Sequence, residues 1–439
     1  MNGRDTRERK RALLGPAASR TARASRAEQT RARRFSLCGV LLFAVCIAVF
    51  SPASRSRAAE PDLKPGTMVG PQNWQAVKGM VGENLLDRIR TGYSFQLNEA
   101  RPRRAPKEYL VATDKYSSQV ALGRNGELLN YVAGIPFPNV NPNDPQGGLK
   151  LAWNFARRWV GDDFKEGGGT LTGKAMSQTI EKDGSERKSE VIRHEIKARG
   201  RVSLEPKPFI PGYEHIDWMI IRADEYPRDT SGTTTLETRY LDPNRDDDLY
   251  VYVPSIRRVR RAPPIQRCAT LAPTEFIYDD VNSFNGKITN FTYRVLGQSR
   301  MLGNLSQREV PFERRNGDYL PLKEGWEIID TYALEITPKD PDYCYPKKIL
   351  YIDQLTYQAL WVVVRDAKGH LWKEQFNLYT RVNLPDGQEV ISSAAPVIVN
   401  VHNGRASVFS TTRAFNQGYQ PSFFTLATLQ TVMRGGSLR

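Results

Sequence analysis

The chain is poor in the residues on which most enzymes and metal sites depend. Its 439 residues include only four histidines and four cysteines. The histidines are scattered (His194, His215, His370 and His402), and no second histidine follows His194-Glu195 at the spacing of a zinc protease. The sequence also lacks a nucleophile elbow, a phosphate-binding loop and a dinucleotide fingerprint. We therefore expect no enzyme activity, no cofactor and no metal, unless distant residues assemble a catalytic site.

Basic residues are concentrated at the start of the chain. The formal net charge is +15, from 63 Lys and Arg against 48 Asp and Glu. Residues 1–58 contain 13 basic and 3 acidic residues and so account for +10, which leaves only +5 for residues 59–439. This remainder has no long basic run and no nucleic-acid-binding motif. Nucleic acid is therefore not an expected partner.

The first 58 residues are typical of a targeting segment. Arginine-rich residues 1–34 precede Phe35–Phe50, a stretch of 16 residues without a charge. That length suits the apolar region of a signal peptide better than a membrane-spanning helix, which needs about 20 residues. Ser56-Arg57-Ala58 fits a cleavage site. We expect export to the periplasm, with residues 59–439 as a single domain; an uncleaved inner-membrane anchor is the alternative.

Only two cysteines follow the apolar stretch. Cys268 and Cys344 are 76 residues apart, which excludes a redox CxxC motif and a zinc finger. In an oxidising compartment they can form a disulfide. Two free thiols are equally compatible with the sequence, because nothing in it shows whether the two Cα atoms come close enough.

From about residue 170 to residue 410 the pattern is that of β-strands. Lys347–Asp353, Tyr357–Arg365 and Leu371–Arg381 predict a three-stranded meander, and Asp366–Gly369 supplies the glycine that hairpin turns favour. Before this region, Leu149–Trp159 predicts an amphipathic helix. Its apolar face contains Leu151, Ala152, Phe155 and Trp159, and its other side contains Lys150, Arg157 and Arg158.

A long antiparallel sheet needs a cover on at least one face. Curling around its own apolar face, with helices such as 149–159 closing the gap, would provide that cover. The expected fold class is therefore mainly β, a curved antiparallel half-barrel with a few covering helices. We expect its interior to be apolar and to hold a ligand at its mouth.

The segment Tyr240–Arg261 combines an acidic turn with a basic strand. Asp246, Asp247 and Asp248 precede the strand Leu249–Val253, and Pro254-Ser255 turns the chain into a strand with Arg257, Arg258, Arg260 and Arg261. We expect the carboxylates and guanidinium groups to pair. The consecutive aspartates lack the alternating spacing of a calcium loop. A surface ion network is the simplest interpretation; a charged rim around a cavity, or a docking surface for an anionic partner, is the alternative.

Four blocks together resemble an exported bacterial family of unknown function whose members are described as outer-membrane lipoprotein-sorting-like. They are GIPFPNVNPNDPQGGLKLAWNFARRWVGD (134–162), RYLDPNRDDDLYVYVPSIRRVRR (239–261), DDVNSFNGKITNFTYRVLG (279–297) and PKKILYIDQLTYQALWVVVRDAKGHLWKE (346–374). The resemblance covers most of residues 59–439 and keeps the blocks in order. It implies the fold of the LolA/LolB lipoprotein carriers.

The resemblance further implies a cavity for acyl chains or another lipid-like ligand and a link with RND-type exporters. It supplies no catalytic residue. The residues that match its helix motif and its charged hairpin are our candidates for ligand or partner binding: Trp153, Asn154, Asp246, Asp247, Arg257, Arg258, Arg260 and Arg261.

Three functions are compatible with these features. The first is a periplasmic, non-catalytic carrier or binding protein for a lipid or other hydrophobic ligand. Contact of this protein with a membrane is compatible with that function. The second is a structural adaptor of an envelope export complex that docks through the arginine-rich hairpin. The third, a hydrolase acting on envelope substrates, would need His215 or His370 buried beside a carboxylate in a cleft.

Overall fold

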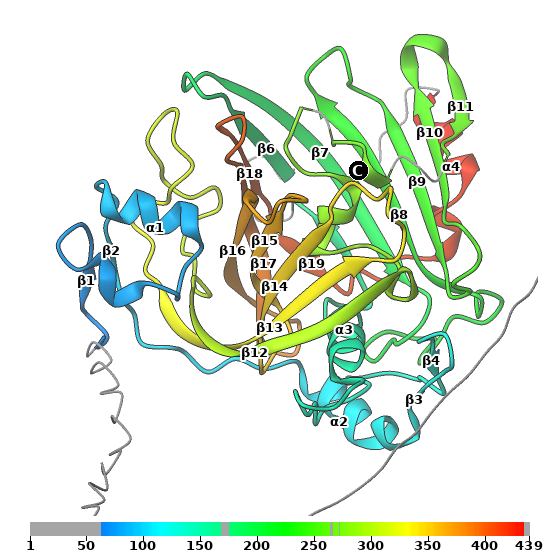
Figure 1. Cartoon of the computed structure of the whole chain (residues 1–439). Helices are drawn as coiled ribbons and strands as arrows, with labels where there is room; N and C mark the ends of the chain where they lie inside the picture. Colours follow the sequence, from blue (N-terminus) through cyan, green and yellow to red (C-terminus); the bar gives the residue numbers. More distant parts are fainter. Residues whose placement is uncertain (1–62, 168–174, 264–266, 272, 434–439) are drawn as a thin grey trace, which may run out of the picture. The chain divides into compact units, whose positions relative to one another are not determined.

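One antiparallel sheet of 15 strands forms the frame of the molecule. In this computed structural model, the described residues are 63–167, 175–263, 267–271 and 273–433; the expected targeting segment, 1–58, lies outside them. The sheet is curved (Figure 1), and because β11 and β12 each have only one neighbour in the strand order, it is open. This confirms the predicted fold class, a mainly β, curved antiparallel half-barrel.

The sheet consists of two meanders. The first contains β6 (Ala175–Ile180), β7 (Glu186–Lys197), β8 (Ile216–Tyr226), β9 (Thr234–Tyr240), β10 (Asp248–Val253) and β11 (Arg258–Arg261). The second contains β12 (Phe291–Gly303), β13 (Glu327–Pro338), β14 (Lys347–Asp353), β15 (Ala359–Arg365), β16 (Leu371–Asn383), β17 (Glu389–Asn400) and β18 (Arg405–Ser410). Pairing of β6 with β18 joins the two meanders. The meander predicted over 347–381 is therefore confirmed as β14–β16.

Short strands complete the β structure. β5 (Asp163–Glu166) pairs with β7 and with β19 (Arg413–Phe415). Two separate ribbons pair β1 (Met68–Val69) with β2 (Phe95–Gln96), and β3 (Ala121–Leu122) with β4 (Leu128–Leu129).

The chain crosses one face of the sheet between its two end strands. β11 and β12 are consecutive in sequence, and the residues between them, 267–271 and 273–290, are here called the inner segment. Lys348 of β14 donates to Asp280 at 2.7 Å, and Asn377 of β16 donates to Ser283 at 3.0 Å. The face of the sheet that makes these contacts is called the inner face.

Helix α3 (Gly147–Arg157) covers another part of the inner face, against β12 and β13 (Figure 1). It begins two residues before the predicted start at Leu149 and ends two before Trp159. All four residues of the predicted apolar face are buried. Gly148 lets the helix approach the sheet closely, because a Cβ at this position would lie 2.5 Å from the carbonyl oxygen of Tyr293.

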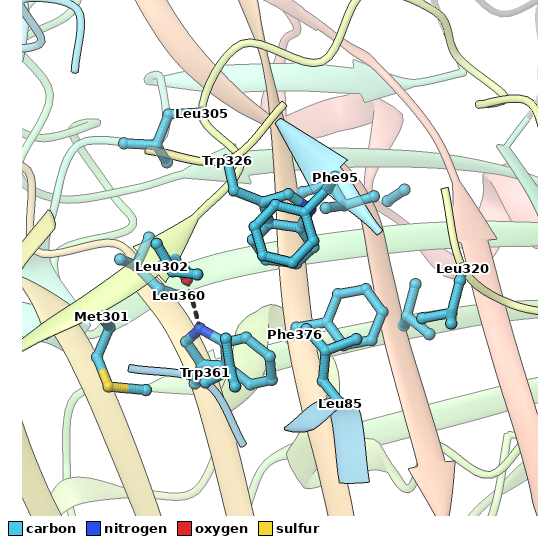
Figure 2. Close-up of a cluster of buried hydrophobic side chains, with 14 of the residues drawn as sticks. Leu85, Phe95, Met301, Leu302, Leu305, Leu320, Trp326, Leu360, Trp361 and Phe376 are labelled. Atoms are coloured by element: carbon cyan, nitrogen blue, oxygen red, sulfur yellow. Dashed lines mark hydrogen bonds between the residues drawn. The ribbon is translucent and has the colours of Figure 1, made fainter. Parts of the chain in front are cut away.

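The opposite, outer face has two apolar clusters. The first lies under the segment that contains α1 (Glu83–Arg90), and its aromatic centre consists of Trp326, Trp361 and Phe376 (Figure 2). The indole N–H of Trp361 is also buried, and it donates to the carbonyl of Leu302 at 2.6 Å (Figure 2). The three rings lie 5.5–6.1 Å apart between centroids, distances at which aromatic pairs attract.

The second outer cluster lies over β7–β9. The C-terminal helix α4 (Leu426–Met433) contributes Leu429 to it, and Phe424 precedes the helix. Both side chains are buried. Helix α2 (Lys107–Tyr116) contributes Tyr109 and Ala112 to the apolar cluster around α3.

The inner face is apolar only in part, and here the prediction of an apolar interior is wrong. Under α3 it carries Leu350 and Ile352, but along β7 and β16 the inward side chains include Arg193, Gln375 and Asn377. Strand periodicity shows which residues share a face. Both faces of this sheet are covered, so alternation of apolar and polar residues could not identify the concave one.

The buried carboxylate of Glu374 holds the start of α1 and makes the free energy of unfolding depend on pH. The carboxylate of Glu374 accepts the backbone N–H groups of Asn84 and Leu85 at 2.8 and 2.9 Å. Burial raises its pKa from 4.5 to about 7. A carboxyl with a raised pKa in the folded protein stabilises the fold most when it is protonated in both states. Its contribution to the free energy of unfolding is therefore lost as pH rises from about 4.5, the unfolded value, to about 7, the folded value.

We therefore expect the free energy of unfolding of the native protein, relative to Glu374→Gln, to fall by up to about 3 kcal/mol between pH 4.5 and pH 7.5. Urea titrations of both proteins at several pH values measure this difference. A difference that does not change with pH would contradict the assignment.

Candidate functional site

Two cavities lie between the inner face of the sheet, α3 and the inner segment. The larger has a volume of about 330 Å³ and is bounded by residues of α3, β7, β8 and β9 and by residues 282–289. The smaller, of about 120 Å³, is bounded by β7–β9 on one side and β16–β18 on the other. Arg158, Asn282 and Asn285 line both cavities and so form part of the wall between them.

The larger cavity has an aromatic wall. Six aromatic residues from separate parts of the chain line it: Tyr131, Trp153, Phe155, Trp218, Tyr240 and Phe284. Three basic residues of the cavity lie over rings of this wall: Arg157 over Trp153 at 5.6 Å, Arg158 over Phe155 at 4.0 Å and Arg239 over Trp218 at 4.7 Å from the ring centroids. The site can therefore accept an apolar or aromatic group beside cationic ones.

Most basic residues around the two cavities are neutralised by carboxylates. In the smaller cavity, Arg193 and Arg413 both contact Glu166, at 2.9 and 3.0 Å. In the larger one, Arg157 pairs with Asp217, while Arg239 pairs with Asp247. Such pairs compensate the cost of burying both charges.

Arg158 differs from these residues. Its side chain is 7% exposed, and within the described part of the chain its guanidinium group contacts no carboxylate. It donates to the Gln358 side chain at 2.9 Å and to the carbonyls of Phe155 and Asn282 at 2.6 and 3.0 Å. Burial lowers the pKa of Arg158 to about 10, so the group remains charged at neutral pH.

Lys197 is the second unusual cation. Lys197 lines the larger cavity, and its ammonium group makes neither a hydrogen bond nor an ion pair with the residues that the structure describes. A third basic residue, Arg199, donates to the carbonyl of Tyr131 at 2.9 Å. Arg158 and Lys197 thus provide positive charge in a cavity whose other cations are largely neutralised.

The pKa of Lys197 gives a testable property of the cavity. The pKa of Lys197 is lowered to about 8, mainly by burial and in part by Arg157, against the opposing effect of Asp162, Glu195 and Asp217. After reductive methylation of the lysines with labelled formaldehyde, we expect one dimethyl-lysine NMR signal to titrate near pH 8, well below the others. The signal that is missing from the spectrum of Lys197→Met is that of Lys197. Titration of every signal near pH 10 would contradict the assignment.

The two predicted residues of α3 have different positions. Trp153 lines the larger cavity, and its indole N–H donates to the carbonyl of Gly126 at 2.8 Å. Asn154 is fully buried and lines neither cavity. Its side chain accepts from the backbone N–H of Phe137 at 2.9 Å and donates to the carbonyl of that residue at 2.6 Å. Asn154 therefore fixes the proline-rich loop before α3.

Within the part of the chain that the structure describes, the acidic turn and the basic strand form one ion pair with each other, between Asp248 and Arg261. Asp247 instead contacts Arg239, Arg267 and Lys287, and Asp246 is exposed. Arg257, Arg258 and Arg260 are exposed at the hairpin of β10 and β11, without an ion pair among the described residues. Arg257 occupies the turn with a φ of 49°. None of these hairpin residues lines either cavity.

Cys268 and Cys344 form a disulfide, which settles the alternative that the sequence left open. The bond joins the inner segment to the connection between β13 and β14. Nearby, Arg267 contacts Asp279 at 2.7 Å and Glu237 at 3.2 Å. Covalent and ionic contacts thus hold the inner segment against the sheet.

The structure does not meet the condition for the hydrolase hypothesis. His215 and His370 are both exposed, and no histidine lines either cavity. His194 is buried, where its Nδ1 lies 2.8 Å from the hydroxyl of Tyr419. Over the described ranges, no group of three or more His, Cys, Asp and Glu side chains could hold a metal ion. None of the described helices is long and apolar enough to span a membrane.

Sequence reasoning missed both unusual cations. We placed Arg158 off the apolar face of its helix, which does not predict that the inner segment and Gln358 bury it. Lys197 lies at the end of β7, in a strand that reads as a polar and apolar mixture. Alternation with Arg193 and Glu195 places it on the inner face, yet only the fold shows that this face lines a cavity.

Comparison with known proteins agrees with the sequence-based resemblance. The model of the family "Protein of unknown function (DUF1329)" matches residues 69–430. Among solved structures, a domain from Vibrio parahaemolyticus described as an outer membrane lipoprotein-sorting protein is 18% identical, with a TM-score of 0.47; the match covers 65% of this chain and 99% of that one. No curated protein matches the chain.

Two further structures are similar. A DUF1329 family protein from Desulfovibrio piger is 18% identical, with a TM-score of 0.46, over 64% of this chain and 97% of that one. A LolA superfamily protein from Nitrosomonas europaea is 15% identical, with a TM-score of 0.38, over 61% and 92% of the two chains.

Proposed function

The chain belongs to the DUF1329 family of proteins of unknown function, and from this premise we propose that it is a non-catalytic carrier or binding protein for a hydrophobic ligand in the periplasm. The larger cavity is the observation that carries this proposal. Its aromatic wall, supplied by α3, β8, β9 and the inner segment, offers apolar contact area to a ligand. The ligand would be a lipid or another hydrophobic molecule that the protein passes to an envelope partner such as an RND-type exporter.

The position of the cavity supports this function. The ligand would lie on the inner face, between α3 and the curved sheet, where its apolar part is removed from water. No covalent step is needed, because burial of apolar surface alone provides about 25 cal/mol per Å². A carrier of this kind retains its ligand in transit and releases it when a partner alters the cavity.

Uncharged phenylnaphthylamine is a suitable probe, because its fluorescence increases in apolar surroundings and it accepts energy from tryptophan. We expect it to bind to the full-length protein and to quench Trp153 and Trp218. The variant Trp153→Phe/Trp218→Phe should retain binding but lose most of the energy transfer. Absence of binding, or equal transfer in the double variant, would place the ligand elsewhere or exclude a carrier.

A second candidate function rests on the hairpin of β10 and β11. Arg257, Arg258 and Arg260 are exposed without an ion pair among the described residues, and Ile256 is exposed beside them. We propose that this surface could dock on an acidic partner in an envelope export complex, which would make the protein a structural adaptor. Charge complementarity of this kind governs association rate and partner choice more than affinity.

Substitution of Arg257, Arg258, Arg260 and Arg261 by serine separates the two functions. An adaptor would lose a crosslinked partner in envelope extracts and would not depend on the aromatic wall. A carrier would keep its affinity for phenylnaphthylamine in this variant. Thermal denaturation of the variant tests whether it is folded. We expect it to be folded, because three of the four arginine side chains make no ion pair within the described residues.

A further inference from the structure

The charge of Arg158 is not explained by the folded chain alone. Transfer of a guanidinium group from water to a protein interior is costly unless a carboxylate or another anion compensates it. Among the described residues, Arg158 donates to neutral acceptors alone, two backbone carbonyls and the side-chain amide of Gln358. Its guanidinium also lies 4.0 Å from the centre of the Phe155 ring, a contact that compensates only part of the charge. These three acceptors engage three of the five N–H groups of the guanidinium and fix its orientation. Two N–H groups are left at a wall that two cavities share.

Lys197 adds a second positive charge to the same cavity. The larger cavity is lined by six basic residues, Arg157, Arg158, Lys197, Arg199, Arg239 and Lys287, and by three acidic ones, Glu127, Glu195 and Asp217. Arg157, Arg239 and Lys287 have carboxylate partners. Lys197 has none within the described residues, and its ammonium makes no hydrogen bond there. The cavity therefore has an excess of positive charge beside its aromatic wall.

Building on the proposed function, we propose that the ligand is an anionic amphiphile whose oxyanion, a carboxylate, sulfonate or phosphate group, binds between Arg158 and Lys197. Its apolar part lies against Trp153 and Trp218. A guanidinium with two free N–H groups matches the geometry of an oxyanion, and a lysine adds a point charge. Charge-assisted hydrogen bonds at such a site are about twice as strong as neutral ones. The oxyanion would supply the counter-charge that the chain does not.

Two probes with the same aromatic skeleton test this proposal. Anilinonaphthalene sulfonate carries a sulfonate, whereas phenylnaphthylamine is its uncharged parent. We expect the full-length protein to bind the sulfonate about tenfold more tightly or better, the effect of a charge-assisted contact. In Lys197→Met and in Arg158→Met this preference should fall to about one, while affinity for the uncharged probe should stay within about twofold.

Lys287→Met is the matched control. Lys287 lines the same cavity and has the same charge, but its ammonium already contacts Asp247 at 3.5 Å. Its removal should leave the preference for the sulfonate intact. If Arg158→Met does not fold, the proposal is tested by Lys197→Met alone. This variant is expected to fold, because the ammonium group of Lys197 has no described partner in the native protein.

The possible results separate the two proposals. Equal affinity of the native protein for both probes, or a preference that survives Lys197→Met, would overturn the anionic ligand and leave the hydrophobic carrier standing. Failure of both probes to bind would overturn both proposals.

Competition identifies the source of the oxyanion. Dodecanoate should displace the sulfonate probe at concentrations at least a hundredfold below those of acetate, roughly the effect of burying several methylene groups. Equal displacement by acetate would indicate a small-anion site and contradict an amphiphile.

Discussion

Replacement of Asp247 by alanine is expected to lower the free energy of unfolding by about 3–5 kcal/mol, as when one partner of a buried ion network is removed. The carboxylate of Asp247 lies 2.9 Å from Arg239, 3.1 Å from Arg267 and 3.5 Å from Lys287. Its side chain is only 8% exposed. Without it, three cations from β9 and the inner segment would repel one another at low solvent exposure. Urea denaturation followed by tryptophan fluorescence measures the change.

Asp246→Ala is the matched control for this prediction. The neighbouring carboxylate is exposed and has no ion pair within the described residues, so its loss should change stability by less than about 0.5 kcal/mol. Equal effects of the two substitutions would show that Asp247 is not the centre of the network.

The effect of Asp247→Ala should also depend on pH. Burial by itself would raise the pKa of Asp247, but Arg239, Arg267 and Lys287 hold it below its usual range. A carboxyl with a depressed folded pKa stabilises the protein above its unfolded pKa, and the contribution is lost as pH falls through the folded value. The difference between the native protein and Asp247→Ala should therefore be constant near neutral pH and should shrink in acid.

Removal of the disulfide is expected to have a similarly large effect. Cys268→Ser/Cys344→Ser opens a loop with a sequence separation of 76 residues, and loop entropy then predicts a loss of about 4 kcal/mol, within an observed range of about 2–5 kcal/mol. The inner segment would lose its covalent link to β13 and β14. Hydrogen exchange should consequently increase most in residues 273–290, which form part of both cavity walls.

Reductant provides the control for this experiment. Dithiothreitol should reproduce the loss in the native protein and should have no effect on the double serine variant. A double variant as stable as the native protein would show that Arg267, Asp279 and Asp280 hold the inner segment without covalent help.

The sequence predicted the regular elements well. Leu151, Ala152, Phe155 and Trp159 define the buried stripe of α3 because helical periodicity depends only on local spacing. The meander β14–β16 follows from alternation and from a glycine turn, which are local as well. The family resemblance, confirmed by the match over residues 69–430, supplied the half-barrel topology that local patterns do not determine.

The site could not be predicted in the same way, because its residues meet only through long-range packing. Arg158 and Gln358 are 200 residues apart, and Arg239 reaches Asn285 across 46 residues. Local charge patterns suggested that the acidic turn would pair with the arginines of its own hairpin. Asp247 instead turns toward β9 and the inner segment, where three cations are less exposed than the hairpin arginines. The polar interior escaped prediction for the same reason.

The measurement that tests the central claim most directly is native mass spectrometry of the full-length protein purified from a Gram-negative periplasm without detergent. We predict a mass above that of the polypeptide, released on denaturation as a hydrophobic molecule with an acidic group, and a bound fraction that falls in Lys197→Met. A polypeptide that remains free of ligand, even after incubation with an extract of envelope lipids, would contradict the carrier function and favour the adaptor.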